Sequence, residues 1–485
     1  MPSASVESYY EGTKGIDMKI YNTLTRRKEE FEPIREGQVN IYVCGPTVYN
    51  YIHIGNARPI VVFDTLRRYM EYRGYKVKYV QNFTDVDDKI INRAKDEGVS
   101  ALEISERYIK EYFDDADALN VRRADVHPKV SEHIDEIENF VDTLVGKGFA
   151  YEADGDVYFS TRKFPEYGKL SGQNIEDLEA GARIAVGEVK EDPIDFALWK
   201  ARKTEDEIAW ESPWGMGRPG WHIECSAMAR RHLGKTIDIH GGGEDLQFPH
   251  HENEIAQSEC CNGVSFANYW MHNGFINIGG SKMSKSAGNF FTVRDIRRKY
   301  TGEEIRFLLL SGQYRGPIEF SEEMMQQSRS SFNRIKNCLD DIEFMIKTGT
   351  DEKLSAEEEK SVDKFDDFRQ AFIKAMDDDL NTADGISAVF ELITEINTML
   401  RGGTSKSYAK AALDIFNELT GVLGIIKAKE TTIDADIEAL VEERQQARKN
   451  KDFARADEIR DELKARGYTL KDTPQGVQII KDESI

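Results

Sequence analysis

Two short segments carry residues that could act on a nucleotide phosphate. In the first, His53, Gly55 and Asn56 form a His-x-Gly-Asn string that begins nine residues after Cys44. A glycine lets the backbone approach a phosphate closely, and an imidazole can hydrogen-bond phosphate oxygens as negative charge grows during displacement. A string this short also arises by chance or as a helix cap, and that interpretation stays open when the string is taken alone.

The second segment is a glycine-flanked loop with two lysines three residues apart, Lys282 and Lys285. Such a loop could close over a triphosphate, where the lysines would neutralise charge that develops on a leaving pyrophosphate. An ordinary solvated loop is the alternative for this segment by itself. Because each segment follows an expected strand, coincidence becomes a poor explanation for the pair.

A scattered set of thiol, imidazole and carboxylate side chains could bind a metal. Cys44, Cys225, His250 and Glu254 would give Zn²⁺ a tetrahedral shell, with Zn–S bonds of about 2.3 Å. His250 and Glu254 are four residues apart and so share one helical face. Each residue also has an ordinary structural interpretation, and their wide separation means that spacing alone does not assemble them. A metalloprotease is excluded, since His251 lacks the second histidine of an H-E-x-x-H helix.

The elements that must position these residues form a split α/β domain. Residues 39–43 and 77–80 are typical of buried strands, and residues 57–74 have the apolar spacing of an amphipathic helix between them. This βαβ unit predicts a parallel sheet, whose carboxyl edge is where such sheets bind ligands. Hairpin and loop patterns interrupt it at 147–215. The pattern then returns with an expected helix at 221–233, a strand at 236–240, a helix from Pro249 and a strand at 274–278.

Beyond residue 320 the apolar spacing is helical almost throughout. We expect helices at 322–347, 355–378, 384–401 and 407–426, a short linker, charged helices at 434–450 and 452–466, and a small β element at 468–470 and 477–480. The predicted fold is therefore a split Rossmann-like catalytic domain with an inserted connective domain, an all-α region and a small mixed α/β carboxyl-terminal element. The expected domains span 18–146, 147–215, 216–320, 321–426 and 433–485.

Composition limits the class of protein. The 485 residues are too many for one compact core, and neither a signal-peptide h-region nor an apolar run of membrane-spanning length occurs. Five cysteines in a chain of this size argue against a disulfide framework and predict reduced thiols in a cytoplasmic enzyme. The formal charge of −22 opposes nonspecific nucleic-acid binding but leaves a specific RNA partner open.

Longer motifs resemble one family. The Lys-Met-Ser-Lys-Ser and His-Ile-Gly-Asn strings together resemble the two signatures of class I aminoacyl-tRNA synthetases. The segments that narrow the resemblance are Cys-Gly-Pro-Thr-Val-Tyr at 44–49, Asn-Phe-Thr-Asp-Val-Asp-Asp-Lys at 82–89, Asp-Phe-Ala-Leu-Trp-Lys at 195–200, Gly-Trp-His-Ile-Glu-Cys at 220–225 and His-Gly-Gly-Gly-Glu-Asp-Leu at 240–246. With matching patterns at 451–460 and 472–476, the chain resembles the cysteinyl-tRNA synthetase family from about residue 19 to residue 481.

The resemblance implies a reaction and a set of roles. It implies one zinc ion per chain on Cys44, Cys225, His250 and Glu254, where the metal would select the substrate thiolate. The implied substrates and partners are L-cysteine, ATP with Mg²⁺, and tRNA(Cys), whose terminal 2′-hydroxyl would attack the cysteinyl-adenylate. A monomer without membrane attachment is expected. The implied amino-acid pocket residues are Thr47, Trp221 and His222. The implied ATP-binding residues are His53, Gly55, Asn56, Lys282 and Lys285. The implied catalytic residues are His53, Asn56, Lys282 and Lys285.

Three questions stay open at this stage. Arg455, Arg460, Lys464 and Arg466 could contact tRNA phosphates or could belong to a solvated helix with acid–base pairs. The same adenylating core could send cysteine to an aminosugar, as in the related ligase of mycothiol synthesis. A zinc-stabilised RNA-binding protein with an inactive nucleotide fold is the non-enzyme alternative.

Overall fold

A four-stranded parallel sheet lies at the centre of the catalytic half of the protein, in the order β10-β9-β3-β4. The computed structural model describes residues 17–175, 189–205, 207–282, 290–350, 353–427, 435–450, 452–473 and 476–481. The sheet strands are β3 (Gln38–Val43), β4 (Lys76–Gln81), β9 (Ile237–Gly243) and β10 (Ala267–Asn273). The predicted α/β class with a parallel sheet and a helical region after it is confirmed.

Helices cover both faces of this sheet. Alternate residues of β3 point to opposite sides, so Ile41 joins the core beneath α1 (Ile54–Tyr72), while Tyr42 joins the core beneath α6 (Trp221–Leu233). The unit β3-α1-β4 is the predicted βαβ crossover, and α1 begins three residues earlier than the periodicity suggested. All strand pairs in this sheet are parallel, so the carboxyl ends of the strands meet along one edge.

One sheet strand differs from the prediction. The fourth strand of the sheet is β10, whereas the expected strand at 274–278 survives only as β11 (Ile276–Ile278) in a separate three-stranded sheet with β12 (Ser281–Lys282) and β13 (Ile318–Glu319). The reason is a change of partner at Gly274, whose N–H donates to the carbonyl of Tyr314 at 2.9 Å. The apolar run therefore belongs to two sheets rather than one.

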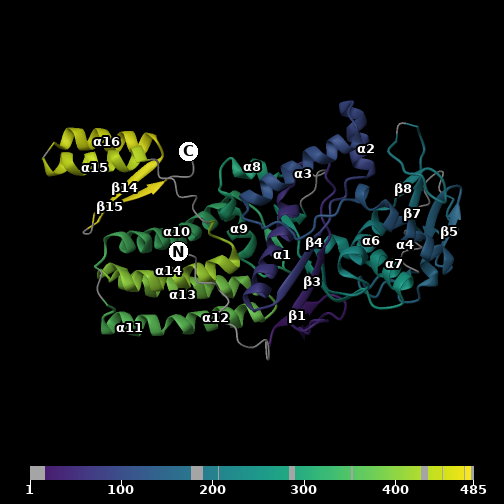
Figure 1. Ribbon diagram of the computed structural model, residues 1–485, viewed down its shortest axis with the longest axis horizontal. Coiled ribbons are helices and arrows are strands. Elements are labelled where there is room, and N and C mark those ends of the chain that lie inside the picture. The colour runs from purple at the N-terminus through teal and green to yellow at the C-terminus, as the bar shows by residue number, and fades with distance from the viewer. Residues whose placement is uncertain are drawn as a thin grey trace.

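The region between the sheet halves contains helices and an antiparallel sheet. Its order is β5-β6-β7-β8, and it lies at one end of the molecule (Figure 1). The elements from α2 to β8 are α2 (Asp88–Glu97), α3 (Ala101–Ala118), the 3₁₀ turn η2 (Val130–Glu132), α4 (Ile134–Gly146), β5 (Ala150–Ala153), β6 (Asp156–Phe159), the 3₁₀ turn η3 (Thr161–Lys163), β7 (Phe196–Ala201) and β8 (Gly217–Pro219).

Helices dominate the other side of the molecule. Figure 1 shows α10 to α14 packed side by side, with the last helices and a β-hairpin beyond them at the far end. These elements are α8 (Val293–Arg297), α9 (Gly302–Leu310), α10 (Glu322–Thr348), α11 (Ala356–Asp363), α12 (Phe365–Asp377), α13 (Thr382–Arg401), α14 (Lys406–Leu423), α15 (Ala435–Lys449), α16 (Phe453–Ala465), β14 (Tyr468–Thr473) and β15 (Gly476–Lys481); β1 (Lys19–Asn22) and β2 (Arg27–Glu30) form the amino-terminal hairpin. The expected helix at 355–378 is two helices that meet at Lys364.

A buried ion network ties the catalytic sheet to the helical region. Arg306 on α9 and Asp64 on α1 are 0% and 2% exposed, and their Nη2 and Oδ2 atoms lie 2.7 Å apart. The same guanidinium donates through Nε to the carbonyl of Leu423 at the end of α14, at 2.8 Å. Burial alone would raise the pKa of Asp64, but Arg306 and Arg68 lower it below its ordinary value. The helix that carries the His-x-Gly-Asn string is thus fixed against the helical region.

Candidate functional site

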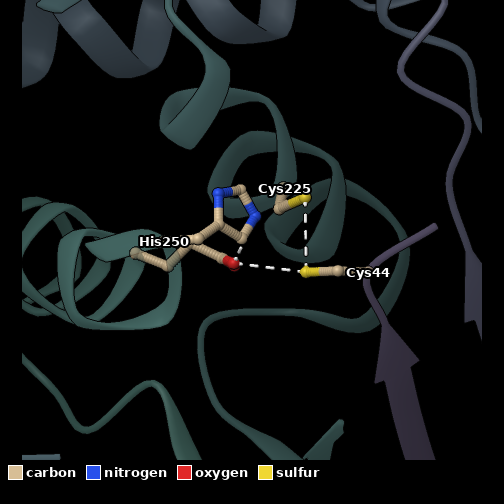
Figure 2. A group of neighbouring side chains, drawn as sticks. Cys44, Cys225 and His250 are labelled. Atoms are coloured by element: carbon tan, nitrogen blue, oxygen red, sulfur yellow. Dashed lines mark hydrogen bonds and ion pairs between the residues drawn. The ribbon is translucent and has the colours of Figure 1, made fainter. Parts of the chain in front are cut away.

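Four side chains from separate elements converge beside the carboxyl edge of the sheet. Cys44 follows β3, Cys225 lies on α6, His250 lies in the kinked turn η5 (Gln247–His251), and Glu254 lies on α7 (Glu252–Asn262). One ligand atom from each lies within 4.8 Å of the other three. Figure 2 shows Cys44, Cys225 and His250 pointing toward one another from these segments. We name the four residues the donor cluster.

Three separations within the donor cluster are close to the edge lengths of a small coordination tetrahedron. The two Sγ atoms lie 3.6 Å apart, and Sγ of Cys44 lies 3.3 Å from Oε1 of Glu254. Nε2 of His250 lies 3.0 Å from the same carboxylate oxygen. Ligands bound to zinc at the usual 2.0–2.3 Å stand about 3.3–3.8 Å from one another, so a metal could enter with small side-chain movements.

Neighbouring polar groups orient the donors. Nδ1 of His250 lies 3.0 Å from Nδ1 of His222, which leaves Nε2 directed at the cluster. Oε2 of Glu254 lies 2.9 Å from Nε2 of His240, which leaves Oε1 as the inward oxygen. A partner that occupies the outer atom of a ligand in this way fixes the ring or carboxylate that would hold a metal.

A second grouping shares two of these residues. Cys44 and Glu254 also lie within 4.8 Å of ring nitrogens of His240 and His251. His251 binds through Nδ1 to Nε2 of His272 at 2.8 Å. The donor cluster has the stronger chemistry, because it brings two sulfur ligands together and uses His240 as support for the carboxylate.

The protonation of the donor cluster favours a cation. Burial alone would raise the pKa of Cys225, but the adjacent Cys44 thiol lowers it to about 6. Burial also raises the pKa of Cys44 well above its ordinary value. Burial would raise the pKa of Glu254 as well, yet His240 and His250 lower it to about 2. Against burial, Glu254 raises the pKa of His250 to about 10. Protons thus occupy two donors that a metal would take over.

A glycine brings the first donor to its place. A Cβ on Gly45 would lie 1.6 Å from the carbonyl oxygen of Asn82, so only glycine allows the loop after β3 to approach the end of β4. The Gly45 N–H donates to Oδ1 of Asn82 at 2.9 Å, and the Val48 N–H donates to the carbonyl of Thr84 at 3.1 Å. These bonds hold Cys44 rigidly at the sheet edge.

A cleft of about 320 Å³ opens beside the donor cluster. The lining of this cleft includes both Cys44, Thr47 and Trp221 and the signature residues His53, Gly55 and Asn56. The Trp221 indole is 39% exposed and stacks on His250 with ring centroids 4.4 Å apart. His222 is absent from the described lining of the cleft and instead contacts His250. The predicted pocket therefore contains Thr47 and Trp221, with His222 behind the donor cluster.

The His-x-Gly-Asn string is both a helix cap and part of the cleft. Nδ1 of His53 accepts the Asn56 N–H at 3.2 Å, and Oδ1 of Asn56 accepts the His53 N–H at 3.3 Å, which forms a capping box for α1. The helix-cap interpretation is thus confirmed, and the same residues also line the cleft. Since Nδ1 accepts a hydrogen bond, a neutral His53 carries its proton on Nε2.

The lysine loop lies partly outside the described residues. Lys285 falls outside them, and for Lys282 only the backbone is described, in the strand β12. The chain that follows the loop returns beside the signature turn: the Val293 N–H donates to the Ile52 carbonyl at 3.0 Å, and the Phe290 ring lies 5.0 Å from the His53 ring. Phe290, the first described residue after the loop, therefore lies beside His53.

Sequence reasoning missed several residues of the cleft and its support. Additional lining residues are Tyr49, Asn50, Tyr51, Gln81, Lys89, Gly243, Asp245, Leu246, Asn273 and Gly274. The motifs at 82–89 and 240–246 already contain two of these lining residues, Lys89 and Asp245, and two supporting residues, Asn82 and His240. Their polar side chains near the ends of expected strands could have indicated a place in the site.

The basic residues of the carboxyl-terminal element are mostly ion-paired. Arg455 pairs with Glu443 at 3.0 Å, Arg460 pairs with Asp457 at 3.2 Å, and Arg466 pairs with Glu462. The Arg460 and Arg466 pairs join residues three or four apart, and the Arg455 pair joins α16 to α15; the side chains of all three arginines are exposed, which favours the solvated-helix alternative over phosphate binding.

Comparisons with known proteins cover nearly the whole chain. The model of the tRNA synthetases class I (C) catalytic domain matches residues 30–330, that of the DALR domain matches 371–427, and that of the cysteinyl-tRNA ligase anticodon binding domain matches 430–479. The cysteine–tRNA ligase of Clostridioides difficile (strain 630) is 59% identical over 462 residues, which span 95% of this chain and 99% of that protein.

Solved structures share the fold at low identity. A Mycobacterium tuberculosis methionyl-tRNA synthetase in complex with methionyl-adenylate matches with a TM-score of 0.57 and 13% identity, over 80% of this chain and 90% of that one. The LeuRS of Agrobacterium radiobacter K84, in a ternary complex with tRNA and LeuAMS, matches with a TM-score of 0.58 and 10% identity, over 81% of this chain and 85% of that one.

Proposed function

Since this chain belongs to the cysteinyl-tRNA synthetase family and joins cysteine to tRNA at the expense of ATP, we propose that a zinc ion on the donor cluster selects the amino acid. The observation that carries the proposal is the convergence of two thiols, one imidazole and one carboxylate within 4.8 Å, at the wall of the cleft that also contains the signature turn. Mg²⁺ would accompany ATP, and we expect a monomer in the cytoplasm. Among the described residues, no helix has the length and apolarity needed to cross a membrane.

Zinc suits this donor set because sulfur and imidazole ligands in tetrahedral geometry are its usual environment. When bound, it would supply a Lewis acid that prefers the soft thiolate of cysteine to the hydroxyl of serine. A site built around one polar group of its substrate rejects analogues that lack the group by roughly 10⁴–10⁵. Selection of that size would make a separate editing site unnecessary.

The chain's own residues would orient the amino acid beside this cluster. The Trp221 indole lies over His250 and would exclude water and larger side chains from the thiol end of the pocket. Thr47, whose backbone is bridged to that of Thr84, would hold the polar end of the amino acid. The cysteine carboxylate would then point along the cleft toward the signature turn.

The other part of the cleft would hold ATP. His53 presents its Nε2–H tautomer there, which is a donor suited to a phosphate oxygen. Gly55 and Asn56 line the same wall at the first turn of α1, where helix N–H groups favour anions. The exposed Asp245 carboxylate also lines the cleft and could accept hydrogen bonds from the ribose hydroxyls. Lys282 and Lys285 would stabilise the leaving pyrophosphate during attack of the carboxylate on the α-phosphate.

The comparisons do not support either alternative activity. The 59% identical relative is named for the tRNA reaction, and the carboxyl-terminal residues match an anticodon binding domain. An aminosugar ligase or an inactive RNA-binding protein has no finding in its favour. The helical region and the carboxyl-terminal element would then contact the tRNA away from its reactive end.

The test is cysteine-dependent charging of tRNA by the purified enzyme before chelation, after chelation, and after return of zinc. Loss of charging on chelation and recovery with zinc would support the proposal, provided that metal analysis gives one zinc per chain. Full charging by enzyme without metal would contradict the role of the donor cluster while leaving the family assignment unchanged.

A further inference from the structure

A lysine and a tyrosine form one edge of the cleft and have no assigned role. Lys89 lies in the first turn of α2, is exposed, and lines the cleft together with Tyr49. Its Nζ lies 5.6 Å from the centroid of the Tyr49 ring. Within the described ranges, no carboxylate pairs with the Lys89 ammonium, although the chain as a whole is strongly acidic. A cation is therefore presented to the cleft with its charge available.

The segment that carries Lys89 is held in place by its neighbour. The Asp88 carboxylate binds Arg218 on β8 and lies 3.1 Å from Nζ of Lys200 on β7. The first turn of α2 is thus fixed against the antiparallel sheet of the inserted region. Lys89 is therefore held in a defined position, and its own ammonium is not neutralised by a paired carboxylate among the described residues.

A second aromatic ring extends this edge. Tyr51 also lines the cleft, and its ring meets that of Tyr108 edge-on at 5.5 Å. The guanidinium of Arg294 lies 4.5 Å above the Tyr51 ring and is anchored to Glu111. Tyr49, Tyr51 and Lys89, which we name the Tyr-Lys edge, therefore place two rings and one cation along the side of the cleft.

Aromatic rings beside a cation match one kind of partner. Single-stranded nucleic acid binds to proteins by stacking bases on aromatic rings while cations contact its phosphates. A free amino acid carries no base, and the single base of a nucleoside triphosphate would occupy one ring and leave the other available. The established reaction does need an unpaired RNA end there, because the terminal ribose hydroxyl must reach the activated cysteine.

We propose that the Tyr-Lys edge receives the single-stranded 3′ end of tRNA, with bases on the two tyrosine rings and a backbone phosphate at the Lys89 ammonium. The edge only positions the RNA: the ribose hydroxyl oxygen bonds to the cysteinyl carbonyl carbon, the bond to AMP breaks, and the hydroxyl proton is lost to solvent. This inference rests on the tRNA-charging function stated above.

The test compares the two half-reactions in Lys89→Gln, with Lys89→Arg as the charge-conserving variant. Single-turnover transfer from preformed adenylate to tRNA should slow about tenfold more than cysteine-dependent pyrophosphate exchange, and Lys89→Arg should restore most of the transfer. Lys95→Gln removes a lysine from the last turn of the same helix and is the matched control; it should change neither half-reaction. Tyr49→Leu should slow transfer in the same selective way.

A binding measurement separates the 3′ end from the rest of the tRNA. Lys89→Gln should weaken binding of intact tRNA about tenfold and leave binding of tRNA without its unpaired 3′ nucleotides unchanged. Equal slowing of both half-reactions would overturn the proposal, since it would place Lys89 at the adenylate phosphate. Unchanged transfer would overturn it as well. Absence of charging by the unaltered enzyme would instead refute the function on which the inference rests.

Discussion

Replacing Cys225 with alanine should remove cysteine selection and spare ATP binding. The Cys225 thiol is 2% exposed, and its sulfur lies 3.6 Å from that of Cys44, so the change deletes one of four donors without opening the cleft to water. Three remaining donors would hold zinc more weakly and would leave its geometry undefined. The substrate thiol would lose the partner that we propose for it.

The magnitude follows from the discrimination that the site must supply. Rejection by ~10⁴–10⁵ corresponds to about 5.5–7 kcal/mol of differential binding. If most of this comes from the metal, kcat/KM for cysteine should fall by ~10³–10⁴, and the preference for cysteine over serine should fall below ~10². The affinity for ATP should change by about twofold at most, because Asn56 and Gly55 share no partner with Cys225 among the described contacts.

Cysteine-dependent pyrophosphate exchange with varied cysteine, serine and ATP gives each of these quantities, and metal analysis gives the zinc content. Cys260→Ala is the matched control, because it deletes another buried thiol, 7% exposed, from α7 outside the donor cluster. It should retain zinc and cysteine affinity. A zinc-free Cys225→Ala enzyme with kcat/KM for cysteine near that of the wild type would refute the reasoning.

Three further changes test other parts of the structure. His240→Ala should lower zinc affinity about 10–100-fold by releasing the outer oxygen of Glu254, measured by competition with a chelator; an unchanged affinity would exclude that supporting role. Lys285→Ala should slow single-turnover adenylate formation by about 10²-fold while cysteine binding is retained, and an unaltered rate would contradict the role of the loop. Asp64→Asn should lower the free energy of unfolding of the catalytic region by about 3–5 kcal/mol, because it leaves the buried Arg306 with less compensating charge. Since the folded pKa of Asp64 lies below the unfolded value, this difference should be full above that unfolded value and shrink as pH falls through the folded pKa; urea midpoints that differ equally at all pH values would contradict the ion pair.

Local patterns predicted much of the fold because they depend on short-range physics. The apolar run of β3 and the apolar spacing of α1 are set by burial against adjacent layers, and the capping box of His53 and Asn56 involves residues only three apart. The prediction for the strand at 274–278 was wrong because apolar residues alone do not determine which sheet a strand joins. That choice depends on the partner carbonyl of Tyr314, a contact between distant segments. The expected domain boundaries stay a prediction.

The sequence by itself determined the chemical types available: two signature strings, and cysteine, histidine and glutamate side chains suited to a soft metal. Only the tertiary structure decided that Cys44, Cys225, His250 and Glu254 share one point in space, that His222 supports His250, and that Lys89 and Tyr49 meet at the edge of the cleft. The physical reason is that the four donors come from the end of β3 and from α6, η5 and α7, whose relative positions depend on sheet order and on core packing on both faces. Local sequence patterns do not predict the distance between two residues that are far apart in the chain and meet only after folding.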